Sequence, residues 1–244
     1  MSPPRLPTLD DIPRNIVCDI VPSKDGKPTN ALILLHGLGD TKEGFTQLAR
    51  NLSLPQTTAI SIQAPTPIPP LITGSDVPSF HWADDISFSS KSGSLDLDGD
   101  FTASIKVITS LVDALTTECH IPPRNIFFLG FGQGGMLALS LIASLPYDIE
   151  YGGVISIGGR LPEAVNEDGK GKKKTPVLIA GGNRKTEITR GALDRIRAVF
   201  VQVEYVKWER EGDGMMKGRE EVLPLMRFWG RRLRTGAPEG TIEI

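Results

Sequence analysis

Residues 128–136 read F-L-G-F-G-Q-G-G-M and join an apolar run to a helix-like segment through a turn rich in glycine. The residues of 126–129 are all apolar, which predicts a strand buried on both faces of a sheet. The segment 133–145 carries the apolar residues of a helix. This order predicts a sharp strand-to-helix turn centred on Gly132.

The segments on either side of this turn alternate between predicted strands and predicted helices. The predicted strands are 15–21, 30–36, 58–63, 126–129, 153–157, 176–180 and 199–208, and the predicted helices are 43–52, 101–118, 133–145 and 220–233. This alternation is typical of an α/β fold, with a mostly parallel central sheet and helices on both faces. We therefore predict a single α/β domain over residues 1–244. The segment 64–100 should form a lid or a loop that borders a pocket, and 235–244 a loosely held tail.

The composition excludes several classes of function. The chain has 27 basic and 29 acidic residues, for a net charge of −2, so nucleic acid is not an expected partner. Cys18 and Cys119 are the two cysteines, too few for a disulfide framework or a zinc site, and they indicate reduced thiols in the cytoplasm. No signal peptide or apolar run of about 18 residues is visible, so we expect neither secretion nor a membrane span.

An acidic run, D-L-D-G-D at 96–100, resembles the start of a calcium-binding loop. The sixth position of that loop requires glycine and here is Phe101, and the twelfth requires glutamate and here is Val107. We expect instead a helix that begins after Asp100, and we expect no metal ion and no cofactor.

The turn at Gly132 lacks the residue that would make it catalytic. In the sequence G-x-S-x-G, a strained turn between a strand and a helix exposes a nucleophilic serine. Here Gly130 and Gly134 flank the turn in the expected way, but the central residue is Gly132. Upstream, L-L-H-G-L-G-D at 34–40 ends a predicted strand at a second glycine-rich turn.

With these two motifs in order, the chain resembles the phospholipase/carboxylesterase group of α/β-hydrolases, which includes the acyl-protein thioesterases. Members carry H-G-L-G-D, then G-F-S-Q-G-G, then a late G-x-x-D loop, and G-M-x-H before the final helix. The resemblance covers about residues 28–234 and implies the α/β-hydrolase fold. At the family level it implies carboxylesterase or thioesterase activity.

All three positions of the family's catalytic triad are substituted in this chain. The resemblance puts the serine at Gly132, the aspartate at Lys185 and the histidine at Lys217. Glycine has no side chain to attack a carbonyl, and a charged lysine neither accepts the proton of a nucleophile nor orients an imidazole. Loss of the nucleophile alone lowers the rate of a triad enzyme by about 10⁶.

The resemblance also implies which residues surround the former reaction centre. The backbone N–H groups of Leu38 and Gln133 should form an oxyanion hole. The residues expected at the border of the pocket are His36, Gly37, His81, Trp82, Asp84, Asp85 and Met215. If Lys185 and Lys217 face the same crevice as the N-terminus of the helix after Gly132, the site becomes cationic and suits a carboxylate or phosphate.

Three interpretations follow. In the first, the protein keeps the fold, lacks serine-hydrolase chemistry, and binds a small anionic or acyl ligand or a protein partner. In the second, it is an active ester or thioester hydrolase with a relocated apparatus around His81 and Asp84 or Asp85. In the third, it is a scaffold whose former pocket is filled at Gly132.

Overall fold

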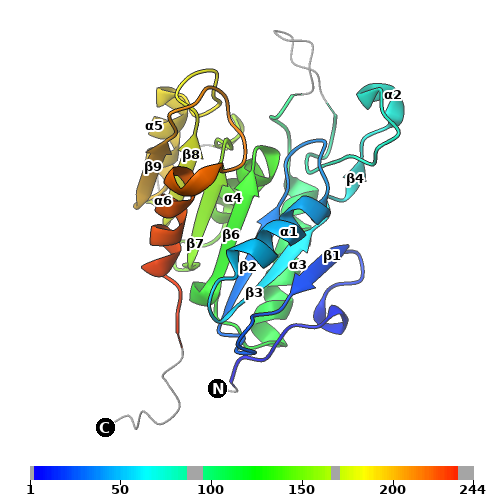
Figure 1. Ribbon diagram of the computed structural model, residues 1–244, viewed down its shortest axis with the longest axis vertical. Coiled ribbons are helices and arrows are strands. Elements are labelled where there is room, and N and C mark those ends of the chain that lie inside the picture. The colour runs from blue at the N-terminus through cyan, green and yellow to red at the C-terminus, as the bar shows by residue number, and fades with distance from the viewer. Residues whose placement is uncertain (1–2, 87–95, 166–170, 236–244) are drawn as a thin grey trace.

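A seven-stranded sheet forms the centre of the computed structural model, which describes residues 3–86, 96–165 and 171–235 (Figure 1). The order of strands across the sheet is β1-β3-β2-β6-β7-β8-β9. Their bounds are β1 Cys18–Val21, β2 Asn30–Leu35, β3 Thr57–Ile62, β6 Ile126–Phe131, β7 Gly153–Ile157, β8 Val177–Gly181 and β9 Val203–Lys207. β1 pairs antiparallel with β3, and every other pair is parallel. The predicted, mostly parallel sheet is confirmed.

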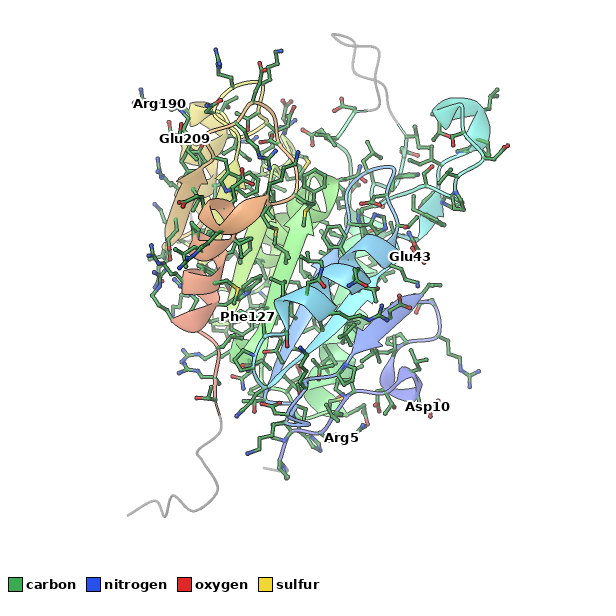
Figure 2. The ribbon with its side chains drawn as sticks, in the orientation of Figure 1. Arg5, Asp10, Glu43, Phe127, Arg190 and Glu209 are labelled. Carbon is green, nitrogen blue, oxygen red and sulfur yellow. The ribbon has the colours of Figure 1, made fainter. Side chains whose placement is uncertain are left out.

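Helices cover both faces of the sheet (Figure 1). α1 (Lys42–Leu52) and α6 (Gly218–Gly230) pack on one face. α3 (Thr102–Thr117), α4 (Gln133–Ser144) and α5 (Arg190–Val199) pack on the other. Figure 2 shows Phe127 of β6 in the interior, where it is fully buried, whereas Arg190 and Glu209 lie on the outer surface. The central strands are mostly apolar because both of their faces are covered.

The helix α5 was missed in the sequence, where the prediction placed a strand over 199–208. The strand begins only at Val203, because Val199 is the last residue of α5. Leu193, Ile196 and Val199 are buried at a spacing of three residues. The hydroxyl of Thr189 accepts the backbone N–H of Ala192 at 3.2 Å and caps the helix. The buried positions of α5 span few residues. The alternating residues of the strand that follows therefore extended the predicted strand back to Val199.

The segment 64–100 has secondary structure that the sequence did not predict. It contains β4 (Thr66–Pro67), which pairs antiparallel with β5 (Phe80–His81), and between them α2 (Pro70–Thr73). Residues 87–95 of this segment and 236–244 of the predicted tail lie outside the described residues. Two 3₁₀ turns, Leu9–Asp11 and Pro123–Asn125, complete the described elements.

Candidate active site

The turn between β6 and α4 keeps the shape of a nucleophile elbow. Gly132 has φ 49° and ψ −117°, a backbone conformation that costs a residue with a side chain about 1–3 kcal/mol. Its N–H donates to the carbonyl oxygen of Ile157 at 2.8 Å, and its own carbonyl accepts the N–H of Met136 at 3.0 Å. The predicted sharp turn is therefore present.

The space above Gly132 is unfilled. The glycine is buried, yet a Cβ atom added to it would meet no heavy atom within 4 Å beyond its chain neighbours and its own helix. A filled pocket would bring side chains into that space. At the position of the Cβ, this observation argues against the third interpretation, a scaffold filled at Gly132.

The two backbone donors expected at an oxyanion hole lie on the turns that follow β2 and β6. Leu38 follows β2 at the carboxyl edge of the sheet, and Gln133 is the first residue of α4. Neither backbone N–H has a hydrogen-bond partner within the described part of the chain. Free N–H groups at a helix N-terminus attract an oxygen that carries negative charge.

Trp82 connects the two turns that carry these donors. Its backbone N–H donates to Oε1 of Gln133 at 2.7 Å, and its indole Nε1 donates to the carbonyl oxygen of His36 at 2.8 Å. The carbonyl oxygen of Trp82 accepts the hydroxyl of Ser104, which fixes the connection to α3. Trp82 and Gln133 are both almost fully buried, so this network sets the relative position of the two turns.

His36 is a structural residue in this network. Its Nε2 accepts the backbone N–H of Ala64 at 3.0 Å and lies 2.9 Å from the amide nitrogen of Gln63. Nδ1 must therefore carry the hydrogen, and it donates to the carbonyl oxygen of Gly37 at 2.8 Å. Burial lowers the pKa of His36, so the ring is neutral at pH 7.

Lys185 lies at the surface of the protein. Its side chain is 79% exposed, and Nζ lies 3.0 Å from Oε1 of Glu211. The residue has φ 48°, a left-handed backbone conformation at the tip of the loop after β8. The expectation that this lysine faces the crevice and helps to make it cationic is wrong, because Glu211 pairs with it at the surface.

Lys217 is also exposed, at the N-cap of α6. Its backbone N–H donates to Oε2 of Glu221 at 2.6 Å. Glu221 also binds Arg210, whose Nε lies 2.7 Å from Oε1, and Arg210 donates to the carbonyl oxygens of Gly214 and Met215. The loop that carries Lys217 is thus fixed through its backbone, with Met215 packed against the core.

Asp213 lies on the loop after β9, to which the resemblance assigns the histidine position. It contacts the loop after β8, to which the resemblance assigns the aspartate position. Its Oδ1 accepts the N–H of Gly182 at 3.0 Å and the hydroxyl of Thr186 at 2.6 Å. Its Oδ2 accepts the N–H of Glu187 at 2.8 Å. A Cβ added to Gly158, at the end of β7, would lie 2.7 Å from the Cβ of Asp213. The carboxylate therefore ties both loops together at the carboxyl edge of β7 and β8.

The backbones of the same two loops also meet directly. Asn183 donates to the carbonyl oxygen of Arg210, and Gly212 donates to that of Arg184. A Cβ at Gly182 would lie 2.2 Å from the carbonyl oxygen of Gly212, so this close approach requires glycine. The two loops form one closed unit in which no imidazole lies next to Asp213.

Arg160 joins this unit to the long segment on the other side of the elbow. Its Nη1 lies 2.8 Å from Oδ2 of Asp98, and its Nε lies 3.3 Å from Oε2 of Glu187. Arg160 and Asp98 are only 18% and 21% exposed. The carboxylate of Asp98 is thus neutralised by a cation of the chain and does not form a calcium loop.

His81 and the neighbouring carboxylates have separate partners and surroundings in the structure. Asp84 accepts the N–H of Ala103 in the first turn of α3, at 3.2 Å and 3.3 Å, and Asp85 is exposed. His81 is 2% exposed, and its Nε2 has no hydrogen-bond partner among the residues that the structure describes. Burial lowers its pKa, while the backbone of Ala83 and the charge of Asp85 act in the opposite direction. Between His81 and either aspartate, the described residues show no hydrogen bond.

The structure thus joins the two turns that carry the expected backbone donors, through Trp82, and leaves Lys185 and Lys217 exposed. Sequence reasoning missed the roles of Asp213, Arg160 and Glu211, because none belongs to a motif and each acts across loops. Within the ranges described, no three His, Cys, Asp or Glu side chains are placed to hold a metal ion. None of the helices in those ranges is long and apolar enough to cross a membrane. Cys18 and Cys119 are both free thiols.

Comparisons with known proteins agree with this architecture. The sequence model of the Phospholipase/Carboxylesterase family matches residues 17–184. An uncharacterized hydrolase of Schizosaccharomyces pombe is 36% identical over 154 residues, 63% of this chain and 62% of that protein. An uncharacterized hydrolase of Mycosarcoma maydis is 31% identical over 220 residues, 87% of this chain and 80% of that protein. The crystal structure of acyl-protein thioesterase 2 from Zea mays superposes with a TM-score of 0.67 at 20% identity, covering 89% of this chain and 99% of the maize chain.

Proposed function

The chain belongs to the phospholipase/carboxylesterase family, and from this premise we propose that it binds an acyl or carboxylate ligand, or a protein partner, at the elbow without hydrolysing it. One observation carries the proposal. Gly132 keeps the strained backbone of a nucleophile elbow below unfilled space, yet has no hydroxyl. The site therefore keeps the geometry that receives a carbonyl group and lacks the atom that attacks it.

The surroundings of the elbow support the same proposal. A serine nucleophile depends on a base that takes its proton and on an acid that orients the base. The corresponding positions carry Lys185 and Lys217, both exposed, and Asp213 is fully engaged by three donors of the opposite loop. Restoring one residue would not rebuild the relay.

The N–H groups of Leu38 and Gln133 define the chemistry of the ligand. In hydrolases, such a pair stabilises the oxygen of a tetrahedral intermediate. Without a nucleophile, the pair suits an oxygen that already carries partial or full negative charge, as in an acyl carbonyl or a carboxylate. The exposure of Lys185 and its pairing with Glu211 favour a neutral acyl carbonyl or a single carboxylate over a phosphate.

An ester and a thioester assay test the proposal against the remaining alternative. We expect no protein-dependent hydrolysis of p-nitrophenyl butyrate or of an S-acyl thioester, within the sensitivity set by the uncatalysed rate. Saturable turnover that is lost in His81→Ala would support the relocated apparatus and overturn the proposal. Turnover that persists in His81→Ala would overturn both.

Binding is tested separately from catalysis. We expect titration of the protein with butyramide to shift the backbone amide resonances of Leu38 and Gln133 saturably. The variant Gly132→Val, whose side chain enters the unfilled space, should abolish these shifts. Shifts that stay unchanged in Gly132→Val would place binding elsewhere and contradict the elbow as the site.

A further inference from the structure

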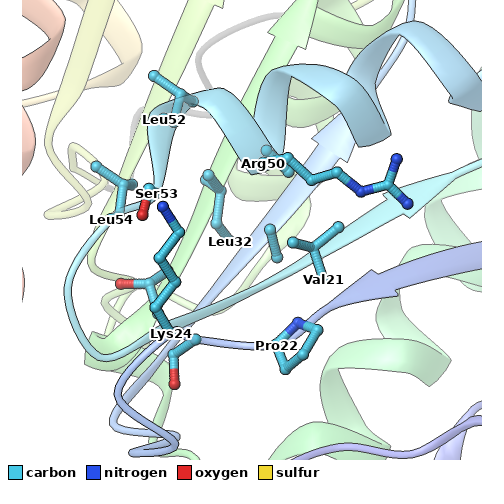
Figure 3. Close-up of a pocket in the computed structure, with 12 residues that line it drawn as sticks. Val21, Pro22, Lys24, Leu32, Arg50, Leu52, Ser53 and Leu54 are labelled. Atoms are coloured by element: carbon cyan, nitrogen blue, oxygen red, sulfur yellow. The ribbon is translucent and has the colours of Figure 1, made fainter.

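A cavity lies beneath the C-terminal end of α1, away from the elbow (Figure 3). It has a volume of about 100 Å³ and is enclosed by α1, the end of β1, and residues of β2 and β3. Thr57 is the first residue of β3, so the cavity lies toward the amino ends of the parallel strands. The elbow and its loops lie at the carboxyl ends of the same sheet.

The inner wall of this cavity is apolar. Leu32, Ala49, Leu54 and Ala59 line it and are each at most 6% exposed. Val21 completes the wall from the edge strand β1. Two of these side chains are alanines, which leave room between the sheet and α1 where larger residues would fill it. An apolar cavity of about 150 Å³ accepts a benzene ring, so this one suits a chain of about four or five carbon atoms.

The rim of the cavity carries two cations. Lys24 extends from the segment after β1 toward the end of α1, and Arg50 lies on α1 at the opposite side (Figure 3). Both residues are exposed, and neither forms an ion pair with any carboxylate of the described chain. Ser53, the C-cap of α1, adds a hydroxyl to the rim.

The nearby carboxylates are engaged elsewhere. Asp25 accepts the backbone N–H groups of Lys27 and Gln56, at 3.3 Å and 3.2 Å. Asp19, the acid within electrostatic range of Arg50, pairs with Lys42 at 2.8 Å. The rim therefore carries two cations that make no ion pair within the described chain, above an apolar wall.

From this juxtaposition we infer that the cavity binds a small carboxylate with a short apolar chain. The chain lies against Leu32, Leu54 and Val21, and the carboxylate lies at the rim between Lys24 and Arg50. A neutral alcohol of the same length gains the apolar contacts but not the charge interaction. An ammonium of the same length meets repulsion from both cations.

Methyl resonances of Leu and Val provide the test, because they separate this cavity from the elbow. The protein labelled at these methyl groups is titrated with sodium pentanoate at constant ionic strength, and in parallel with pentan-1-ol and pentylammonium. We expect saturable shifts at Leu54 and Val21, and a dissociation constant for pentan-1-ol about fivefold weaker than for pentanoate, as for one exposed ion pair. Pentylammonium should not bind.

Charge variants decide whether the rim acts as inferred. Lys24→Met should weaken pentanoate about twofold, the share of one of the two cations, and leave pentan-1-ol unchanged. Lys106→Met removes an exposed lysine of α3 and should change neither. Because both lysines are exposed, neither variant disturbs the core, and thermal unfolding checks this. Equal affinity for pentanoate and pentan-1-ol, an unchanged pentanoate affinity in Lys24→Met, or no saturable shift at Leu54 would each overturn the inference.

Discussion

The carboxylate of Asp213 accepts the backbone N–H of Gly182 at 3.0 Å and thereby joins the loop after β9 to the loop after β8. In a serine hydrolase of this family the corresponding loops carry a histidine and an aspartate that contact each other through their side chains. Here the loops meet through the carboxylate of Asp213 and through direct backbone hydrogen bonds. These contacts give the two loops a structural connection.

Removal of this carboxylate should destabilise the protein. Asp213→Ala leaves the N–H groups of Gly182 and Glu187 without their acceptor, and hydrogen bonds to a charged group contribute about 1.5–3 kcal/mol. We expect the free energy of unfolding, measured by urea denaturation, to fall by about 2–3 kcal/mol. Asp194→Ala, which removes an exposed carboxylate on α5, is the control and should cost at most about 0.5 kcal/mol. Equal stability of the two variants would contradict the role of Asp213.

A side chain at position 132 should lower the free energy of unfolding through backbone strain alone. Gly132→Ala and Gly132→Ser add a Cβ that meets no other atom, so both should lower the free energy of unfolding by about 1–3 kcal/mol through strain. Neither should hydrolyse esters. Thermal unfolding and an ester assay on both variants test this. Efficient hydrolysis by the serine variant would show that a functional base is present.

Acid should weaken the fold before the carboxylates titrate. Burial lowers the pKa of His36 and His81 below 6.5, so both are neutral in the folded protein and take up protons more readily when unfolded. The free energy of unfolding should therefore fall as the pH drops from 7.5 to about 5, by up to about 1.4 kcal/mol per pH unit for each histidine.

The variant His81→Met isolates one contribution to this slope. Its free energy of unfolding should fall less steeply than that of the wild type over the same pH range. His120→Asn, which removes an exposed histidine, controls for the substitution itself. A slope in His81→Met equal to the wild-type slope would exclude His81 as a source of the acid sensitivity.

The cluster of Arg160, Asp98 and Glu187 should stabilise the fold more than an ordinary surface ion pair does. Arg160→Met leaves Asp98 and Glu187 without their cation in a partly buried position, and we expect a loss of about 1–3 kcal/mol, between exposed and buried pairs. Arg124→Met breaks an exposed pair with Glu150 and should cost at most about 1 kcal/mol. Urea denaturation measures both. A loss in Arg160→Met no greater than in Arg124→Met would contradict the structural role of the cluster.

Local sequence patterns predicted the fold, whereas they predicted only part of the candidate site. Buried strands such as β6 and β7 are mostly apolar, and the glycines around Gly132 fix the turn that follows β6. These signals lie within a few residues of one another. The position of Lys185 depends instead on its pairing with Glu211 across two loops, and Asp213 acts on residues 26 to 31 positions away. No periodicity in the chain encodes such contacts, so the expected cationic pocket was wrong.

Labelling by a fluorophosphonate tests the central claim most directly, because the reagent reacts with an activated serine and leaves a covalent adduct. The wild-type protein and an active acyl-protein thioesterase are incubated with the reagent under identical conditions, and the intact masses are measured. We predict that the thioesterase gains the mass of one adduct and that this protein keeps its unmodified mass. Stoichiometric labelling of this protein at a serine, together with ester turnover lost in parallel, would contradict the account.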